Sequence, residues 1–312
     1  MPSAGLVIRP FRPEDAPARV ALAREIQPWI VVTPRGLLHR LETEPPRARA
    51  RHWSAESEGR LVGAATARFA WWTERADLAE LSIAVRRDAR GRGIGGRLYA
   101  LAEEYLVTGG ARRVEAWVVD DAGERFAAAR GYEPTRSAQL WSVDPRTIDV
   151  GDLPRLARDR AAEDLRVVPL RAVRERERDL HALYAEAAGD EPADEPETNV
   201  PFDDWRRMLD DPDLSLDGSF VVLHRDRPVS FAWLGVDAER GRGTHWMTGT
   251  LRQYRRRGLA RLAKMATIRW AAENGITALY TGNDSTNADM LALNEHLGYR
   301  RTTTGTTYAK ET

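Results

Sequence analysis

The sequence Arg90-Gly91-Arg92-Gly93-Ile94-Gly95 returns in a second form 165 residues later, as Arg255-Arg256-Arg257-Gly258-Leu259-Ala260. Both copies follow the pattern Arg-x-x-Gly-x-Gly/Ala. Each comes after a short apolar run, residues 81–85 or 246–250, and opens a segment with apolar residues at helical spacing, residues 94–107 or 259–272. The pattern predicts two loops that each join the end of a strand to the start of a helix.

Such a loop is suited to binding a pyrophosphate. Backbone N–H groups are free at the start of a helix, the helix dipole is positive there, and small residues let the backbone approach the phosphate oxygens. The spacing Gly91-x-Gly93-x-x-Gly96 also satisfies the dinucleotide-binding fingerprint. The second copy argues against that class, because it lacks the outer glycines and has no acidic residue at a strand end about 20 residues on. No Gly-Lys-Ser/Thr follows either loop, which argues against a Walker-type site.

The repeat extends well beyond the loops. A glycine follows the loop glycine after 17 residues in both copies, and a Gly-Tyr pair, Gly131-Tyr132 or Gly298-Tyr299, follows after 38 or 40 residues. A surface loop absorbs a difference of two residues easily. The sequence therefore predicts two homologous domains, 1–145 and 165–312, joined by a linker over 146–164.

Composition narrows the classes of protein that fit. The 312 residues suit two domains, and the net charge of +0 argues against nonspecific binding to nucleic acid or to a membrane surface. The absence of cysteine excludes disulfides, thiolate metal sites and a cysteine nucleophile. We expect no metal. A start without a signal peptide and the lack of a long apolar run predict a cytoplasmic protein.

The residues quoted above resemble the GNAT superfamily of N-acetyltransferases, present here as a tandem pair. The opening Arg9-Pro10-Phe11 is similar to the family's first strand and turn, and Thr281-Gly282-Asn283 to a late strand. The resemblance implies an α/β (α+β) fold in which each domain is a mixed, mostly antiparallel sheet flanked by helices. Its fourth and fifth strands splay apart, and acetyl-CoA lies in the gap.

Carried over position by position, the resemblance also implies which residues contact acetyl-CoA. The pyrophosphate would lie on the loop amides, the pantetheine along the neighbouring strand end, and two asparagines of the second domain would hold the pantetheine amides. The implied cofactor-binding residues are Val85, Arg90, Gly91, Arg92, Gly93, Ile94 and Gly95 in the first domain and Thr250, Leu251, Arg255, Arg256, Arg257, Gly258, Leu259, Ala260, Asn287 and Asn294 in the second.

Acetyl transfer to an alkyl ammonium requires its deprotonation, because the pKa of such a group is about 10.4. In the family the base often lies on the strand before the loop, where Glu80 and His245 occupy equivalent positions. The alternative for His245 is a hydrogen-bonded residue of the core, and the alternative for Glu80 is a charged side chain that faces the edge of the strand. Many members protonate the leaving thiolate with a tyrosine four residues before the Gly-aromatic pair; this chain has Ala127 and Asn294 there, so water or another tyrosine is expected to do so.

The sequence as a whole predicts an acetyl-CoA-dependent N-acetyltransferase with direct attack in a ternary complex and a catalytic second domain, because Asp120 and Ala127 replace Asn287 and Asn294 in the first. The expected acceptor is a small-molecule or peptide amine, and the expected assembly a monomer or homodimer. The architecture is also similar to that of mycothiol synthases, a group within the family that acetylates the amine of a small thiol. A non-catalytic CoA-sensing or protein-binding module is the alternative. An acidic loop over residues 190–201 is expected to cover the second site or to be simply solvated.

Overall fold

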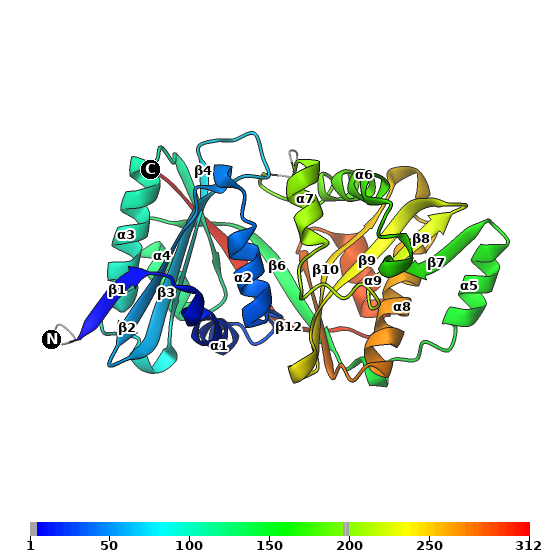
Figure 1. Cartoon of the computed structure of the whole chain (residues 1–312), viewed down its shortest axis with the longest axis horizontal. Helices are drawn as coiled ribbons and strands as arrows, with labels where there is room; N and C mark the ends of the chain where they lie inside the picture. The colour runs from blue at the N-terminus through cyan, green and yellow to red at the C-terminus, as the bar shows by residue number, and fades with distance from the viewer. Residues whose placement is uncertain (1–4, 196, 198–199) are drawn as a thin grey trace. The chain divides into compact units, whose positions relative to one another are not determined.

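The computed structural model describes residues 5–195, 197 and 200–312, and it divides into two compact units (Figure 1). Unit 1 extends to Ser137 and includes Gly305–Thr312. Unit 2 comprises Ala138–Thr304. Each unit contains a sheet with helices on its faces, and each is described here by itself.

The sheet of unit 1 has the strand order β1-β2-β3-β4-β5-β12. β2 and β3 form a hairpin at Glu58-Gly59, where both residues have positive φ (53° and 73°), as a type I′ turn requires. Only the β4–β5 pairing is parallel, so the sheet is mixed and mostly antiparallel. The strands are β1 (Leu6–Pro10), β2 (Arg51–Ser57), β3 (Arg60–Phe69), β4 (Leu78–Val85), β5 (Arg113–Val118) and β12 (Arg300–Glu311), of which residues 306–311 pair with β5.

Helices cover both faces of this sheet, and Figure 1 shows α3 on one side and α1 and α2 on the other. Successive side chains of β3 point alternately toward the two layers of helices. Gly63 lies against α3, where a Cβ would come within 3.1 Å of Leu98, whereas the Thr66 hydroxyl accepts a hydrogen bond (2.8 Å) from Arg19 of α1. The helices of unit 1 are α1 (Ala16–Ile26), α2 (Pro34–Glu42), α3 (Ile94–Thr108) and α4 (Asp121–Ala128).

Unit 2 repeats this plan with the strand order β6-β11-β10-β9-β8-β7. Its core is aromatic: Trp205, Trp233 and Phe231 are at most 1% exposed. The strands are β6 (Glu133–Val143), β7 (Leu165–Pro169), β8 (Phe220–His224), β9 (Arg227–Asp237), β10 (Arg242–Thr250) and β11 (Ala278–Asp284), and the helices are α5 (Leu153–Ala161), α6 (Glu177–Ala188), α7 (Phe202–Met208), α8 (Leu259–Glu273) and α9 (Ala288–His296).

The boundaries of the units differ from those expected from the sequence, 1–145 and 165–312 with a linker at 146–164. Residues 306–311 near the end of the chain pair with β5 in unit 1, and residues 138–143 pair with β11 in unit 2. The region expected to be linker contains α5, which packs within unit 2. Strand pairing between residues far apart in the chain produces these boundaries, and the spacing of local motifs does not reveal it.

The predicted fold class is confirmed: two α/β units, each with a mixed, mostly antiparallel sheet and helices on its faces. Within the described part of the chain, no helix combines the length and the apolar character needed to cross a membrane.

Candidate functional site

The two loops have the same backbone conformation. Arg90 and Arg255 are extended (φ −64° and −65°), and Gly93 and Gly258, the N-cap residues of α3 and α8, are left-handed (φ 79° and 73°). Apart from the adjoining residues of the loop and helix, no atom of the described part of the chain lies within 4 Å of a Cβ built on either N-cap glycine, so the space beside each glycine is open. Both loops thus present free helix amides in the geometry that binds phosphate.

The first arginine of each loop binds protein groups in the structure. Arg90 Nε donates to the Val85 carbonyl at the end of β4 (3.3 Å), and its guanidinium pairs with Asp120 (3.0 Å). Arg255 Nε donates in the same way to the Thr250 carbonyl (3.1 Å) and pairs with Asp190. These side chains therefore anchor the loop to the end of the preceding strand.

The third arginine of each loop is also bound to protein groups. Arg92 donates to the Asp88 carbonyl (3.2 Å), and Arg257 pairs with Glu163 (2.5 Å).

Asp190 belongs to the expected acidic loop, of which residues 196, 198 and 199 lie outside the described residues. Because it pairs with Arg252 and Arg255, the Asp190 carboxylate is engaged by unit 2's own loop.

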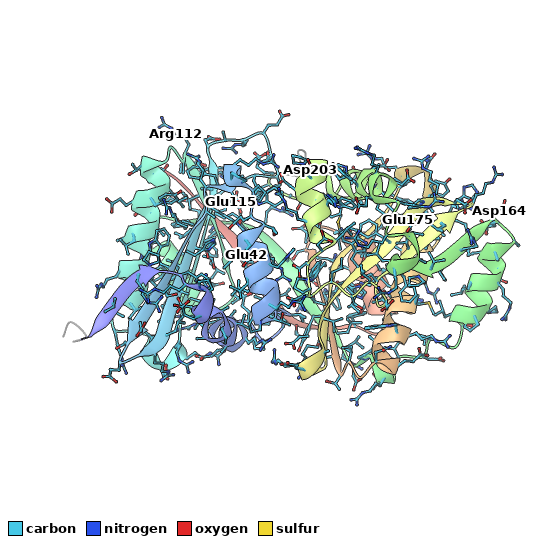
Figure 2. All side chains as sticks on the ribbon, in the orientation of Figure 1. Glu42, Arg112, Glu115, Asp164, Glu175 and Asp203 are labelled. Atoms are coloured by element: carbon cyan, nitrogen blue, oxygen red, sulfur yellow. The ribbon has the colours of Figure 1, made fainter. Side chains whose placement is uncertain are left out.

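In both units the two parallel strands separate after three residue pairs. β4 pairs with β5 from Leu78–Arg113 to Glu80–Glu115, and β10 pairs with β11 from Arg242–Ala278 to Thr244–Tyr280. Glu115, labelled in Figure 2, marks the last paired position on β5. The splayed strands that the family resemblance implies are thus present twice.

In unit 1 the gap between the splayed strands is a cavity of about 590 Å³. Its volume is within the range of small-molecule sites, roughly 300–1,000 Å³. Residues of five elements and the loop line it: residues 81–85 of β4, residues 116–118 of β5, Leu22 and Ile26 of α1, Ile94 and Tyr99 of α3, Phe126 and Ala127 of α4, and the loop glycines Gly91, Gly93 and Gly95. A mostly apolar slot with helix amides at one end suits a ligand that has an apolar arm and a phosphate group.

Unit 2 has polar side chains at the positions that line this cavity in unit 1. Lys264, the sixth residue after its loop glycine, corresponds to Tyr99, and Asn294 corresponds to Ala127. Lys264 Nζ donates to Asn294 Oδ1 (2.7 Å), and both residues are 0% exposed. Burial lowers the pKa of Lys264 to about 7. A hydrogen-bonded cluster thus occupies the positions that border open space in unit 1.

His245, expected as a base, belongs to this buried cluster. His245 Nε2 and the Tyr299 hydroxyl share a hydrogen bond (2.9 Å), while Nδ1 is buried and has no hydrogen-bond partner among the described residues. Burial and the neighbouring Lys264 hold the pKa of His245 well below its ordinary value. A bulge in the pairing of β10 with β9 between His245 and Met247 also interrupts the regular alternation of β10.

The other expected site residues make contacts within the protein. Glu80 pairs with Arg68 on β3 (2.6 Å), and the cavity wall begins one residue later, at Leu81. Asn287 caps α9 by accepting from Met290 N (3.3 Å), just as Asp120 caps α4 by accepting from Gly123 N (2.7 Å). The sequence favoured a catalytic second domain partly because Asn287 replaces Asp120. In the structure both side chains cap a helix, so this pair does not distinguish the two units.

Sequence reasoning missed several polar groups on the wall of the unit 1 cavity, among them Tyr99, Arg130 and Tyr132. Tyr132 belongs to a recognised motif, but its pattern does not distinguish a packing aromatic from a wall residue. Tyr99 lies within an apolar helical pattern, where a tyrosine is usually interpreted as a core residue. Comparison with the equivalent Lys264 could have identified it, because polar residues at the same buried position of both repeats are unusual.

Comparisons with known proteins give a consistent result. A model of the acetyltransferase (GNAT) family matches residues 22–132 and 178–299. A mycothiol acetyltransferase from Thermobispora bispora is 28% identical over 244 residues, which cover 77% of this chain and 78% of that protein.

Two solved structures share the fold along nearly the whole chain. A tandem GNAT protein from the clavulanic acid biosynthesis pathway matches with a TM-score of 0.74 at 19% identity, covering 98% of both chains. A GCN5-related N-acetyltransferase from Sphaerobacter thermophilus matches with a TM-score of 0.66 at 18% identity, covering 98% of this chain and 95% of that one.

Proposed function

Because the chain belongs to the acetyltransferase (GNAT) family, we propose that it is an acetyl-CoA-dependent N-acetyltransferase whose acetyl-transfer site is the cavity of unit 1. The observation that carries this proposal is the continuity of the cavity with the phosphate loop: Gly91, Gly93 and Gly95 line the same space as β4 and β5. The proposal moves the reaction from the second domain, where the sequence placed it, to the first.

Each part of the cavity wall has a task in this proposal. The free amides at the start of α3 hold the pyrophosphate, and the part of β4 beyond Glu80 offers unpaired backbone groups to the pantetheine amides. The small side chains of Ala84, Ala116 and Ala127 leave room for the arm. Acetyl-CoA supplies the activated acetyl group, and the apolar wall excludes water that would compete with the acceptor amine.

The acceptor enters against α1 in this proposal, because Leu22 and Ile26 of α1, together with Ile30 beyond its end, line the cavity. Direct attack of the amine on the thioester is favoured, since the chain has no cysteine to carry the acetyl group. The similarity to a mycothiol acetyltransferase favours the amine of a small thiol as the acceptor to test first. A non-catalytic CoA-sensing module would bind acetyl-CoA at the same loop without turnover.

A second candidate keeps the transfer in unit 2 with His245 as the base. It is favoured by the buried, unpartnered Nδ1 of this residue, which has a lone pair or proton to offer to a group entering the gap. In that candidate the ligand has to displace or rearrange the Lys264–Asn294 pair, because these side chains occupy the equivalent wall.

The test is a screen of amine acceptors, including the cysteinyl amine of a small thiol, with amide formation read by mass spectrometry. Calorimetry with acetyl-CoA on Gly93→Asp, Gly258→Asp and the double variant locates the binding site. We expect Gly93→Asp to remove binding and Gly258→Asp to retain it. Unchanged affinity in a folded double variant overturns the acetyltransferase proposal, and binding without transfer to any acceptor favours the sensing module.

A further inference from the structure

Two tyrosines lie together on the wall of the unit 1 cavity. Tyr99 on α3 and Tyr132, just before β6, are 8% and 4% exposed, and both line the cavity. Their rings meet edge to face with centroids 6.3 Å apart. The pair forms a polar spot in a mostly apolar wall, and Tyr99 begins a line of polar groups that leads to the surface.

A carboxylate continues this line toward the surface. The Tyr99 hydroxyl donates to Glu103 Oε1 (2.5 Å), one turn further along α3. Lys310, from the strand β12, donates to the same carboxylate oxygen (2.5 Å) and to the Tyr99 hydroxyl (3.2 Å). The side chains of Glu103 and Lys310 are 28% and 26% exposed, so the line that begins at the cavity wall ends in contact with solvent.

The chemistry of the groups fixes the direction of these hydrogen bonds. An ionised carboxylate only accepts, so Tyr99 donates to Glu103, while the Tyr99 oxygen accepts from Lys310. The Tyr99 oxygen has a second lone pair, which can accept a proton on the cavity side. The Tyr99 O–H thus points outward, from the cavity to Glu103.

The surrounding charges keep each group in the protonation state that this arrangement needs. Burial raises the pKa of both tyrosines, so both phenols keep their protons. Burial also opposes ionisation of Glu103, but hydrogen bonds from Lys310 and Tyr99 outweigh it and lower the pKa of the carboxyl. The other charged group facing them is Arg130, at the end of α4, whose guanidinium carbon lies 4.9 Å from the centroid of the Tyr99 ring.

An ammonium acceptor loses two protons when it becomes an amide. One ends on the sulfur of CoA when the carbon–sulfur bond breaks, and the other must leave the site. Building on the function proposed above, we propose that Tyr99 and Glu103 form an exit path for this second proton, with Lys310 as the residue that positions Glu103. A proton accepted at the Tyr99 oxygen is matched by one passed from Tyr99 to Glu103, which releases it to water.

Unit 2 lacks this path although it has the same backbone. Lys264 replaces Tyr99, and Ile268, 0% exposed, occupies the position equivalent to Glu103. Tyr299 therefore hydrogen-bonds to His245 instead of to a line that leads to solvent. The path distinguishes unit 1 as the half equipped to remove a proton.

The test compares Tyr99→Phe and Glu103→Gln with Tyr105→Phe. Tyr105 is on the same helix, and its hydroxyl also donates one hydrogen bond, to the Arg49 carbonyl, so the control loses an equivalent contact outside the path. We expect Tyr99→Phe and Glu103→Gln to lower kcat by about tenfold or more, with the KM for acetyl-CoA little changed. The acid limb of the pH profile should move to higher pH in both, since a larger share of the acceptor must then arrive already neutral. Tyr105→Phe should keep the parental profile.

A solvent deuterium isotope effect gives a readout that packing alone does not move. It should be larger in the parent than in Tyr99→Phe, because only the parent moves protons along the path. If both path variants keep the parental kcat, pH profile and isotope effect, the path is wrong, while the proposed acetyltransferase function stands. Absence of acetyl transfer by the parent overturns the proposed function and the path with it. Should Tyr99→Phe fail to fold, Glu103→Gln, at a partly exposed position, decides alone.

Discussion

Units 1 and 2 share a backbone and differ in what occupies the gap between their splayed strands. Both have a left-handed N-cap glycine and strands that separate after three pairs. In unit 1 Ala127 borders an open cavity, whereas in unit 2 Asn294 at the same position is buried against Lys264. The comparison teaches that the loop and the splay are properties of the scaffold, while a few side chains decide which groups line the gap.

The largest expected effect comes from the same substitution made in each loop. Gly93→Asp places a carboxylate where the pyrophosphate is proposed to bind, and like charges in contact cost several kcal/mol, so turnover should fall by about 100-fold or more. Gly258→Asp is the matched control, since its backbone and its open surroundings are the same. Steady-state kinetics check this. A larger loss in Gly258→Asp would place catalysis in unit 2.

Filling the open gap with the residue from unit 2 should have the next largest effect. Ala127→Asn introduces an amide into the apolar wall without the lysine that binds it in unit 2, and an unpaired buried polar group costs about 1–3 kcal/mol. We expect the Kd for acetyl-CoA to rise by roughly tenfold in calorimetry. The neighbouring Ala128 is exposed, so Ala128→Asn serves as the control and should retain parental affinity. Equal affinities would mean that the arm does not pass Ala127.

The buried lysine of unit 2 should reveal itself in the pH dependence of stability. The pKa of Lys264 is about 7 in the folded chain and 10.5 for an ordinary lysine, so between these values the unfolded chain binds more protons. The free energy of unfolding should therefore rise with pH across this window, by at most about 1.4 kcal/mol per pH unit from this group. This gain in stability should be lost as the pH falls toward 7.

Lys264→Met should remove that slope. Lys310→Met is a matched control at the other lysine of the chain, because its partner Glu103 titrates at acid pH, outside the window. Urea unfolding at several pH values measures both. A slope that persists in Lys264→Met would show that the lysine is not buried as a neutral amine.

The parts of this molecule that the sequence predicted are those set by local patterns. The strand-loop-helix segments around Gly93 and Gly258 follow from glycine positions and apolar spacing, and the Glu58-Gly59 hairpin from turn chemistry. The pairing of β12 with β5 was not predictable, because no local signal links residues almost 200 positions apart. Of the proposed site, the sequence predicted the position and backbone of the loops, and their binding of acetyl-CoA stays a prediction.

The contents of the gap were hidden from the sequence for a different reason. Asn287 and Asp120 look chemically different in an alignment of the repeats, yet both cap a helix, because either side chain offers the oxygen that a cap needs. Tyr99 and Lys264 lie inside apolar helical patterns, and their neighbours come from other strands and helices. Which polar residues meet in the gap depends on contacts that only the folded chain brings together.

The smallest expected effect concerns the one position where the loops differ in backbone strain. Arg256 has a φ of 61° where Gly91, its counterpart, has 77°, and a side chain in this region costs about 1–2 kcal/mol. Arg256→Gly relieves that strain, but the freer glycine also gains entropy in the unfolded chain, about 0.5–1 kcal/mol, so the net gain in stability should be below about 1 kcal/mol. The reverse change, Gly91→Arg, meets open space at Cβ and should lose a similarly small amount, because the same strain is partly offset by the lower entropy of arginine in the unfolded chain. Denaturation midpoints compare the two. If Gly91→Arg is as stable as the parent, the loop of unit 1 tolerates a side chain at this position as well as the loop of unit 2 does. The glycine at position 91 would then be explained only by the approach of a phosphate to the backbone.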